Sequence, residues 1–242
     1  MRFATLDASV LSRLLHRQRP EGSGTCDAGY HEGRKTRRSL IYRLRRRTDE
    51  VLRCAREYVR RPVTSVLDVG TADAAMLARL QRELPGAVCV GVDLATDLLA
   101  IARGEGLPLV RADAQALPIQ AASFDLVVAT AVIEHVPHPF QLAREAAACL
   151  KPGGLLVITT PDPFWEQLAT LVGHLPDEQH HETLHLDQLA ALCSEAGLQV
   201  VESSKFMLSP VGLPLELPVE ALVRRLGLQA LMANQLVAAR AP

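Results

Sequence analysis

Residues 66–77 constrain the fold of this chain more than any other stretch. They begin with an apolar, β-branched run, pass through a turn of small residues and one acid, and end in a helical spacing of apolar residues that continues to Leu80. The stretch therefore predicts a strand, a tight loop and a helix. Such a loop, at the carboxyl end of a parallel strand, lets a ligand lie against bare backbone and the N–H groups of the helix start.

The same alternation of strand and helix patterns continues through most of the chain. Further strands are predicted at residues 87–92, 107–111, 124–130, 155–160, 198–202 and 231–239. Helices are predicted after a cap at Thr96 or Asp97, over 140–150 up to a Pro152-Gly153-Gly154 turn, after His185 or Asp187, and over 219–226. Continuous apolar strands separated by helices are typical of an α/β, doubly wound fold with a mostly parallel sheet.

Basic residues concentrate in the first quarter of the chain. Residues 1–61 contain 16 Lys and Arg against 7 Asp and Glu (+9), and residues 62–242 contain 10 against 20 (−10), which together give the net charge of −1. This asymmetry divides the chain into a basic helical N-terminal segment over 1–61, a lid or outer helix, and a second domain over 62–242.

Within the basic segment, apolar residues at helical spacing predict a long amphipathic helix over 37–60. Its arginines lie mostly off the apolar stripe: Arg38, Arg45, Arg46, Arg53 and Arg60. We interpret them as a solvated outer face. The alternative, a nucleic-acid or anionic-membrane surface, is less favoured because no aromatic residues lie between the arginines to stack on bases.

Composition sets broad limits on the kind of protein. The chain is 48% hydrophobic, which suffices for one sizeable core, but it has no apolar run long enough for a membrane span and no secretory pattern at its N-terminus. Its five cysteines are scattered and form no CxxC pair. We therefore expect a cytoplasmic protein with buried, reduced cysteines and no metal.

Polar residues follow four of the predicted strands where each strand ends. They are Asp68, Asp93, Asp113 and Thr130. Because the carboxyl ends of parallel strands meet at one edge of the sheet, these side chains are expected to share one ligand site.

Six further motifs occur in a fixed order. They are VLDVG at 66–70, GVDL at 91–94, RADA at 111–114 followed by Leu117-Pro118, SFDLV at 123–127, IEHV at 133–136 and LKPGG at 150–154. In this order the chain resembles the class I S-adenosylmethionine-dependent methyltransferases, of the small-molecule group that includes ubiquinone- and menaquinone-biosynthesis enzymes. The resemblance implies a Rossmann-like methyltransferase fold with a seven-stranded sheet whose last strand is antiparallel, S-adenosyl-L-methionine as cofactor and a small-molecule substrate.

The resemblance also implies which residues bind the cofactor. They are Asp68, Gly70, Thr71, Ala72, Asp73, Asp93, Leu94, Asp113, Ala114 and Thr130. Gly70 would let the backbone approach the methionine part, Asp93 would accept both ribose hydroxyls, and Asp113 would lie where the adenine amino group is read.

The loop after the first strand departs from the family pattern, since Ala72 and Ala74 stand where similar enzymes have glycines. Alanine is unfavourable at positive φ and adds a methyl group against the ligand. Either the loop accommodates alanine in an allowed geometry, which we favour, or cofactor binding is weakened. Asp73 would then hydrogen-bond the cofactor's ammonium group or cap the next helix.

Two histidines are candidate catalytic residues. His135 follows the fourth strand beside Glu134, where a role in holding the loop is the favoured alternative to catalysis. His181 is one of a cluster, with His174, His180 and His185, that could supply a base for the substrate or form a solvated loop, and a metal site is least favoured because the spacing separates the rings.

The main hypothesis is a methyltransferase acting on a small molecule. The alternative is a catalytically silent relative that binds a partner through its basic N-terminal helix. Nucleic-acid methylation is not favoured, because it rests on the arginines alone. A dinucleotide enzyme is disfavoured because Asp73 would meet the pyrophosphate with like charge. The leucines at 213, 215 and 217 serve a homodimer or cap the sheet.

Overall fold

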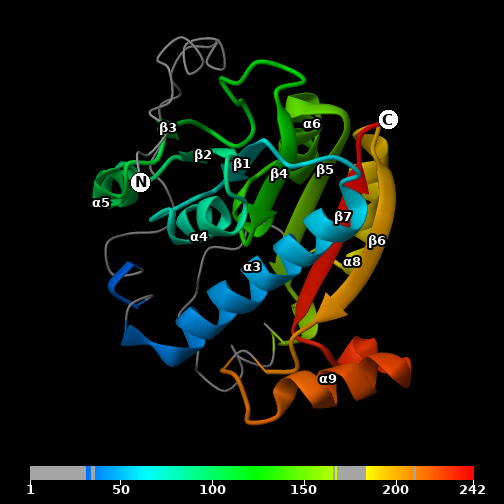
Figure 1. Cartoon of the computed structure of the whole chain (residues 1–242). Helices are drawn as coiled ribbons and strands as arrows, with labels where there is room; N and C mark the ends of the chain where they lie inside the picture. The colour runs from blue at the N-terminus through cyan, green and yellow to red at the C-terminus, as the bar shows by residue number, and fades with distance from the viewer. Residues whose placement is uncertain (1–30, 34–35, 166, 168–183, 210) are drawn as a thin grey trace.

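The computed structural model describes residues 31–33, 36–165, 167, 184–209 and 211–242. One seven-stranded sheet with the order β3-β2-β1-β4-β5-β7-β6 forms its centre (Figure 1). The strands are β1 Ser65–Val69, β2 Val88–Asp93, β3 Leu109–Arg111, β4 Phe124–Thr130, β5 Leu150–Pro161, β6 Gln199–Phe206 and β7 Asn234–Arg240. Strands β1 to β5 pair in parallel, and β7 is antiparallel to both of its neighbours. The predicted doubly wound sheet with an antiparallel last strand is confirmed.

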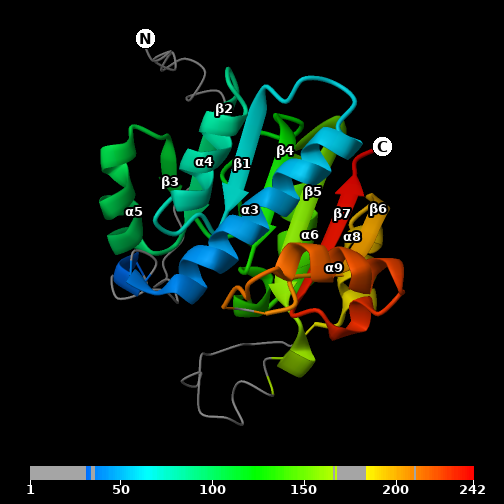
Figure 2. The same cartoon turned by 60° about the horizontal axis from the view of Figure 1, so that its bottom comes forward.

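Helices cover both faces of the sheet (Figures 1 and 2). The α-helices are α3 Arg38–Tyr58, α4 Ala75–Glu83, α5 Thr96–Ala102, α6 Pro139–Cys149, α8 Leu186–Glu195 and α9 Glu216–Arg225, with short 3-10 turns η1 Arg103–Glu105, η2 Ile133–His135 and η3 Gln229–Leu231. Helices α3 and α4 share one apolar core with the sheet, and α6 and α8 share another on its opposite face. Because α3 belongs to a core of the sheet, it is an outer helix of the same fold, and the division of the chain at residue 61 stays a prediction.

The Pro152-Gly153-Gly154 motif differs from its predicted role as a turn between a helix and a strand. It lies inside β5, which starts at Leu150 and shifts register against β4 near Phe124. A Cβ at Gly154 would lie 2.8 Å from the Lys151 carbonyl oxygen, so the missing side chain lets the chain bulge without leaving the strand.

The expected solvated arginine face of the N-terminal helix is wrong for Arg46, which is buried, and Arg53 of the same face is half-buried. The neighbouring Arg47 is buried as well. Arg46 and Arg47 are 7% and 8% exposed. The Arg46 guanidinium donates to Glu220 at 2.7 Å, and that of Arg47 donates to the side-chain oxygen of Asn234 at 3.1 Å. Arg38 and Arg45 are exposed as expected. The partners of Arg46 and Arg47, one acid and one amide, lie near the far end of the sequence, outside the reach of any helical pattern.

Within the part of the chain that the structure describes, none of the helices combines the length and the apolar composition needed to cross a bilayer.

Candidate cofactor site

The loop after β1 is pressed between β2 and the start of η2. The backbone N–H groups of Gly70 and Thr71 both donate to the Val92 carbonyl oxygen, at 2.8 and 3.0 Å. Gly70 has φ +75°, and a Cβ there would lie 2.6 Å from Cγ2 of Val132. The position therefore requires glycine on two grounds, its backbone angle and the contact with Val132.

The two alanines that replace family glycines adopt left-handed backbone conformations. Their φ angles are +51° for Ala72 and +57° for Ala74. These angles lie in the small left-handed region that side-chain-bearing residues can occupy at a cost of about 1–2 kcal/mol each. The loop thus accommodates alanine in an allowed geometry, and the effect on cofactor affinity stays a prediction.

Asp93 joins this loop to the next helix. Its Oδ2 accepts the N–H of Ala72 at 2.7 Å, and its Oδ1 accepts the N–H of Ala95 at 2.8 Å. The predicted Thr96 or Asp97 cap is wrong, since α5 begins after Ala95 without a side-chain cap and Asp93 takes the N–H just before it. A carboxylate offers about four acceptor sites, so these backbone bonds and a ligand's hydroxyl groups can share it.

The side chains of Asp68 and Thr71 hydrogen-bond to each other. The Thr71 hydroxyl donates to Asp68 Oδ2 at 2.9 Å, and both residues are 2% exposed. A Cβ at Gly91 would lie 2.8 Å from the Thr71 methyl group, so the Thr71 side chain points into the sheet. The structure therefore gives both residues a loop-shaping role, and direct contact with a cofactor would come from the backbone around them.

Asp113 lies beside Asp93 at the ends of neighbouring strands, since Asp93 pairs with Arg111 in the parallel register. Its Oδ1 accepts the N–H of Gln115 at 2.8 Å, which fixes the carboxylate in a local turn. Asp113 and Leu94 are half-buried and Ala114 is buried, so the strand ends present two carboxylates next to apolar side chains.

Thr130, the fourth predicted strand-end residue, ends β4. Its hydroxyl lies 3.6 Å from the Met76 sulfur of α4. The four strand-end positions thus share one edge of the sheet, as predicted.

Asp73 has a contact that the sequence did not predict. The imidazole Nδ1 of His31 lies 2.9 Å from Asp73 Oδ2, and Oδ1 accepts the Ala75 N–H at 3.4 Å. Helix α4 has no side-chain cap at Ala74, so the Ala75 contact is a weak substitute for one. His31 comes from the basic segment 42 positions away, and no local sequence rule links the two residues.

Of the two candidate catalytic histidines, His135 lies within the described residues and His181 does not. His135 ends η2 directly after β4, and the neighbouring Glu134 is 3% exposed with no hydrogen-bond donor to its Oε2 among the described residues. His181, like His174 and His180, lies outside the described residues. His185 caps α8, as predicted, in a reciprocal pair with Gln188. The described residues also contain no group of three metal-ligating side chains.

A groove of about 680 Å³ lies between the start of α6 and helix α8. Its walls include Phe140, Leu184, Leu192 and Gln188. None of the predicted cofactor residues lines it, so the groove is a surface separate from the strand-end carboxylates.

A family model described as "Methyltransferase domain" matches residues 34–203. The chain belongs to this family. The match begins near the start of α3 and ends in β6, so it covers most of both cores and all the strand-end residues of the candidate site, and β7 lies beyond it.

Relatives of this methyltransferase-family chain include a "Ubiquinone biosynthesis O-methyltransferase" of Xanthomonas axonopodis pv. citri, 34% identical over 60% of this chain and 66% of that protein. The chain thus spans just under two thirds of that relative. The fold is shared with Haemonchus contortus phosphoethanolamine N-methyltransferase 2, solved with S-adenosyl-L-methionine (TM-score 0.60, 19% identity, 80% of this chain, 52% of that one). It is also shared with the [4+2]-cyclase SpnF (TM-score 0.59, 20% identity, 81% of each chain). These likenesses establish the fold, and SpnF's name indicates that the fold alone does not fix the reaction.

Proposed function

We propose that this protein is an S-adenosylmethionine-dependent methyltransferase acting on a small molecule. The observation that carries the proposal is the pair of half-buried carboxylates, Asp93 and Asp113, at neighbouring strand ends beside the glycine-containing loop. The polar groups that S-adenosylmethionine would present to such acids, the ribose hydroxyls, the adenine amino group and the ammonium, are all hydrogen-bond donors. The residues present therefore fit the cofactor, whereas a pyrophosphate would meet like charge at Asp73 and Asp93.

We assign the chain's residues the following parts. Asp93 would accept the ribose hydroxyls, Asp113 the adenine amino group, and Leu94 with Ala114 would pack on the ring. The backbone of Gly70 to Ala72 would face the methionine part, with Asp68 and Thr71 holding its shape. Thr130, at the end of β4, would lie on the side of the reacting methyl group.

When bound, the cofactor supplies a methyl group on a sulfonium sulfur, which is a good leaving group. The protein then has to hold the acceptor in line and exclude water, and such positioning can supply about 7–11 kcal/mol of barrier reduction in favourable cases. No protein nucleophile is required.

The acceptor atom we infer is a hydroxyl oxygen, on the ground that relatives about one third identical are named O-methyltransferases. A hydroxyl must lose its proton as the oxygen is methylated, so a general base is expected. His135, next to the end of β4, and His181 are the two candidates. A cytoplasmic location and a dimer are further expectations that this scheme does not need.

The alternative of a silent binding protein acting through the arginines of α3 has no observation in its favour. Arg46 is buried against Glu220, so it is not presented to a partner.

Calorimetric titration with S-adenosylmethionine tests the proposal. Wild-type protein is expected to bind, and Asp93→Asn to bind about tenfold or more weakly, because hydrogen bonds to a charged group contribute about 1.5–3 kcal/mol. Asp97→Asn is the matched control, since it removes an exposed carboxylate four residues away on α5 and should bind like wild type. Absence of binding by the wild type at millimolar ligand would refute the proposal, and thermal melting of both variants separates lost affinity from lost folding.

A further inference from the structure

Helix α9 turns its charged side chains toward the protein and its apolar side chains toward solvent. Its charged residues Glu216, Glu220 and Arg224 recur every four positions and face the protein, where the two glutamates are 5% and 4% exposed. Its leucines face outward: Leu217 is 58% and Leu222 is 55% exposed. This is the reverse of the usual arrangement in a globular protein, in which the apolar stripe of a surface helix faces the core.

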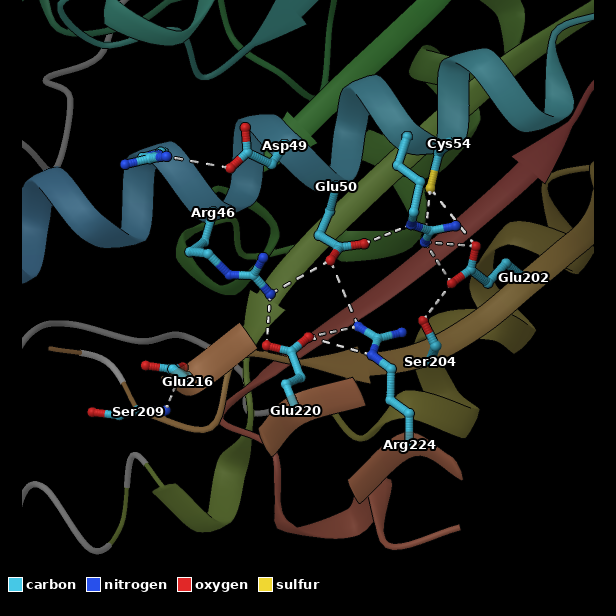
Figure 3. Close-up of polar contacts among 12 residues, drawn as sticks. Arg46, Asp49, Glu50, Cys54, Glu202, Ser204, Ser209, Glu216, Glu220 and Arg224 are labelled. Atoms are coloured by element: carbon cyan, nitrogen blue, oxygen red, sulfur yellow. Dashed lines mark hydrogen bonds and ion pairs between the residues drawn. The ribbon is translucent and has the colours of Figure 1, made fainter. Parts of the chain in front are cut away.

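Ion pairs with α3 hold the helix in this orientation (Figure 3). The Arg46 guanidinium lies 2.7 Å from Glu220, and Glu50 Oε1 lies 3.6 Å from both Arg46 and Arg224. Arg224 also bonds Glu220 at 3.0 Å, which closes the cluster. Turning the leucines inward would take Glu220 away from the buried Arg46, which would keep Glu50 alone at 3.6 Å, and loss of a partner by a buried charge is strongly unfavourable.

The loop before α9 is fixed to the same inward face. Glu216 accepts the backbone N–H groups of Ser209 at 3.0 Å and Leu213 at 2.9 Å. A Cβ at Gly212 would lie 2.8 Å from the ring of Tyr42, so the loop lies flat on α3 at that point. The two backbone bonds to the buried Glu216 thus hold the loop on the inward side of α9, and its side chains Leu213 and Leu215 stay exposed.

The exposed apolar surface extends well beyond the helix. It comprises Val211, Leu213, Leu215, Leu217, Val219, Leu222, Leu226, Leu228 and Leu231, each between 46% and 76% exposed. We call these nine residues the leucine face. Over residues 211–231 the single exposed charged residue is Arg225, and no acid is exposed. Exposed large apolar side chains concentrated in one segment in this way indicate an interaction site in a folded protein.

The leucine face lies at the same edge of the sheet as the candidate cofactor site. It connects the end of β6 to the start of β7, where Asn234 pairs with both Phe206 and Pro161 (Figure 2). The indole N–H of Trp165, in the segment after β5, donates to the Leu231 carbonyl oxygen at 3.1 Å, and the adjacent Phe164 is 65% exposed. Trp and Phe beside exposed leucines are typical of surfaces that sit at a lipid–water boundary.

We propose that the leucine face docks on a bilayer that contains anionic lipids, with α9 lying in the interfacial plane. The charge around the face favours this occupant. Arg225 lies within it. Arg45, whose side chain is 74% exposed and lies 4.0 Å from Asp49, lines a cavity of about 260 Å³ together with Asp49, Leu213, Leu215 and Leu217, so Arg225 is the cation of the face itself. Anionic headgroups complement this cation, whereas a second copy joined by a two-fold axis would bring the same basic residue to the same interface.

Co-sedimentation with lipid vesicles tests this inference on the full chain. Wild-type protein should bind vesicles of phosphatidylcholine mixed with phosphatidylglycerol, bind phosphatidylcholine alone more weakly, and lose affinity for the mixed vesicles as salt is added. The double variant Leu222→Ser/Leu226→Ser should bind at least about tenfold more weakly, because it loses the free energy that two leucine side chains gain when they move from water into the bilayer. Arg225→Glu should reduce binding to the mixed vesicles alone, by about fivefold or more.

Ile101→Ser is the matched control, since Ile101 is a 40% exposed apolar residue on α5, outside the leucine face. It should bind vesicles like wild type. If a variant of the helix proves unstable in a melting experiment, Leu215→Ser repeats the test on the loop, where the side chain is 76% exposed and packs on little.

Three results would overturn the inference. They are a wild type that ignores the mixed vesicles, a double variant that binds them as well as wild type, or a wild-type dimer in analytical ultracentrifugation that the double variant converts to a monomer without any vesicle binding. Cofactor binding is read separately by calorimetry, so failure of the docking does not count against the proposed reaction.

Discussion

Two edges of the same sheet use aspartate in different ways. At the amino edge, Asp125 of β4 accepts the Thr64 N–H at 3.0 Å and the Ser65 hydroxyl at 2.9 Å, and it meets Lys151 at 3.1 Å and Arg61 at 3.0 Å. At the carboxyl edge, Asp93 accepts backbone N–H groups and remains half-buried. The first carboxylate is enclosed by cations and hydroxyls of its own chain and is 2% exposed, whereas the second keeps part of its surface open to solvent. The surroundings of an aspartate, and not the residue type, therefore decide whether it stabilises the sheet or is available to a ligand.

The largest expected effect comes from disturbing the carboxyl edge at Gly70. Gly70→Ala combines a left-handed φ with a Cβ placed 2.6 Å from Val132. We expect a loss of about 2–5 kcal/mol in unfolding free energy, from about 1–2 for the backbone angle and about 1–3 for the overpacking. Urea denaturation measures this loss, and cofactor affinity should fall with it.

Gly86→Ala is the control for that experiment. Gly86 has φ +88° and nothing within 4 Å of an added Cβ, so it isolates the backbone cost of about 1–2 kcal/mol. Equal losses in the two variants would mean that the contact with Val132 relaxes freely, and the claim that the loop is tightly pressed there would be wrong.

The next effect concerns the amino edge. Burial alone would raise the pKa of Asp125, but hydrogen bonds from Thr64, Lys151 and Ser65 lower it from 3.8 to about 2. A depressed folded-state pKa contributes stability that is fully present above about pH 4 and is lost as the pH falls toward 2. Asp125→Asn should therefore cost about 2 kcal/mol at neutral pH and lose less additional stability than wild type over that acid window.

Urea denaturation between neutral pH and pH 2 measures the effect, with Asp97→Asn, which removes an exposed carboxylate on α5, as the control. Parallel pH profiles of wild type and Asp125→Asn would show that the charge of this carboxylate does not stabilise the sheet. Neither variant should alter cofactor affinity, which is what distinguishes the amino edge from the carboxyl edge.

The features that the sequence predicted are those carried by local patterns. Continuous apolar strands, each followed by a polar residue, predict a parallel sheet with Asp68, Asp93, Asp113 and Thr130 at one edge, because strand direction alone brings these ends together. The structure confirms that arrangement. For Ala72 and Ala74 the sequence left two outcomes, an allowed loop geometry or weakened cofactor binding, because the need for positive φ is a property of the loop itself.

The features that the sequence missed depend on contacts between distant positions. Arg46 and Glu220 are 174 positions apart, so α3 could be predicted as amphipathic but not as a helix whose basic side meets acids. The spacing of Glu216, Glu220 and Arg224 predicts a charged stripe on one side of a helix. That this stripe faces inward follows only from the ion pairs with Arg46 and Glu50 of α3. His31 and Asp73 are equally out of reach for any local pattern.

The smallest expected effect concerns two alanines with positive φ, one at each edge of the sheet. Ala74 at the carboxyl edge and Ala122 before β4 at the amino edge have similar left-handed φ angles, +57° and +54°. Replacement of either by glycine relieves about 1–2 kcal/mol of backbone strain, offset by about 0.4–1 kcal/mol from the greater freedom of glycine in the unfolded chain. Both variants should therefore gain between nothing and about 1.6 kcal/mol of unfolding free energy in urea denaturation. Only Ala74→Gly should also change the affinity for S-adenosylmethionine, because only that alanine borders the proposed site, and a change of affinity in Ala122→Gly would erase the distinction between the two edges.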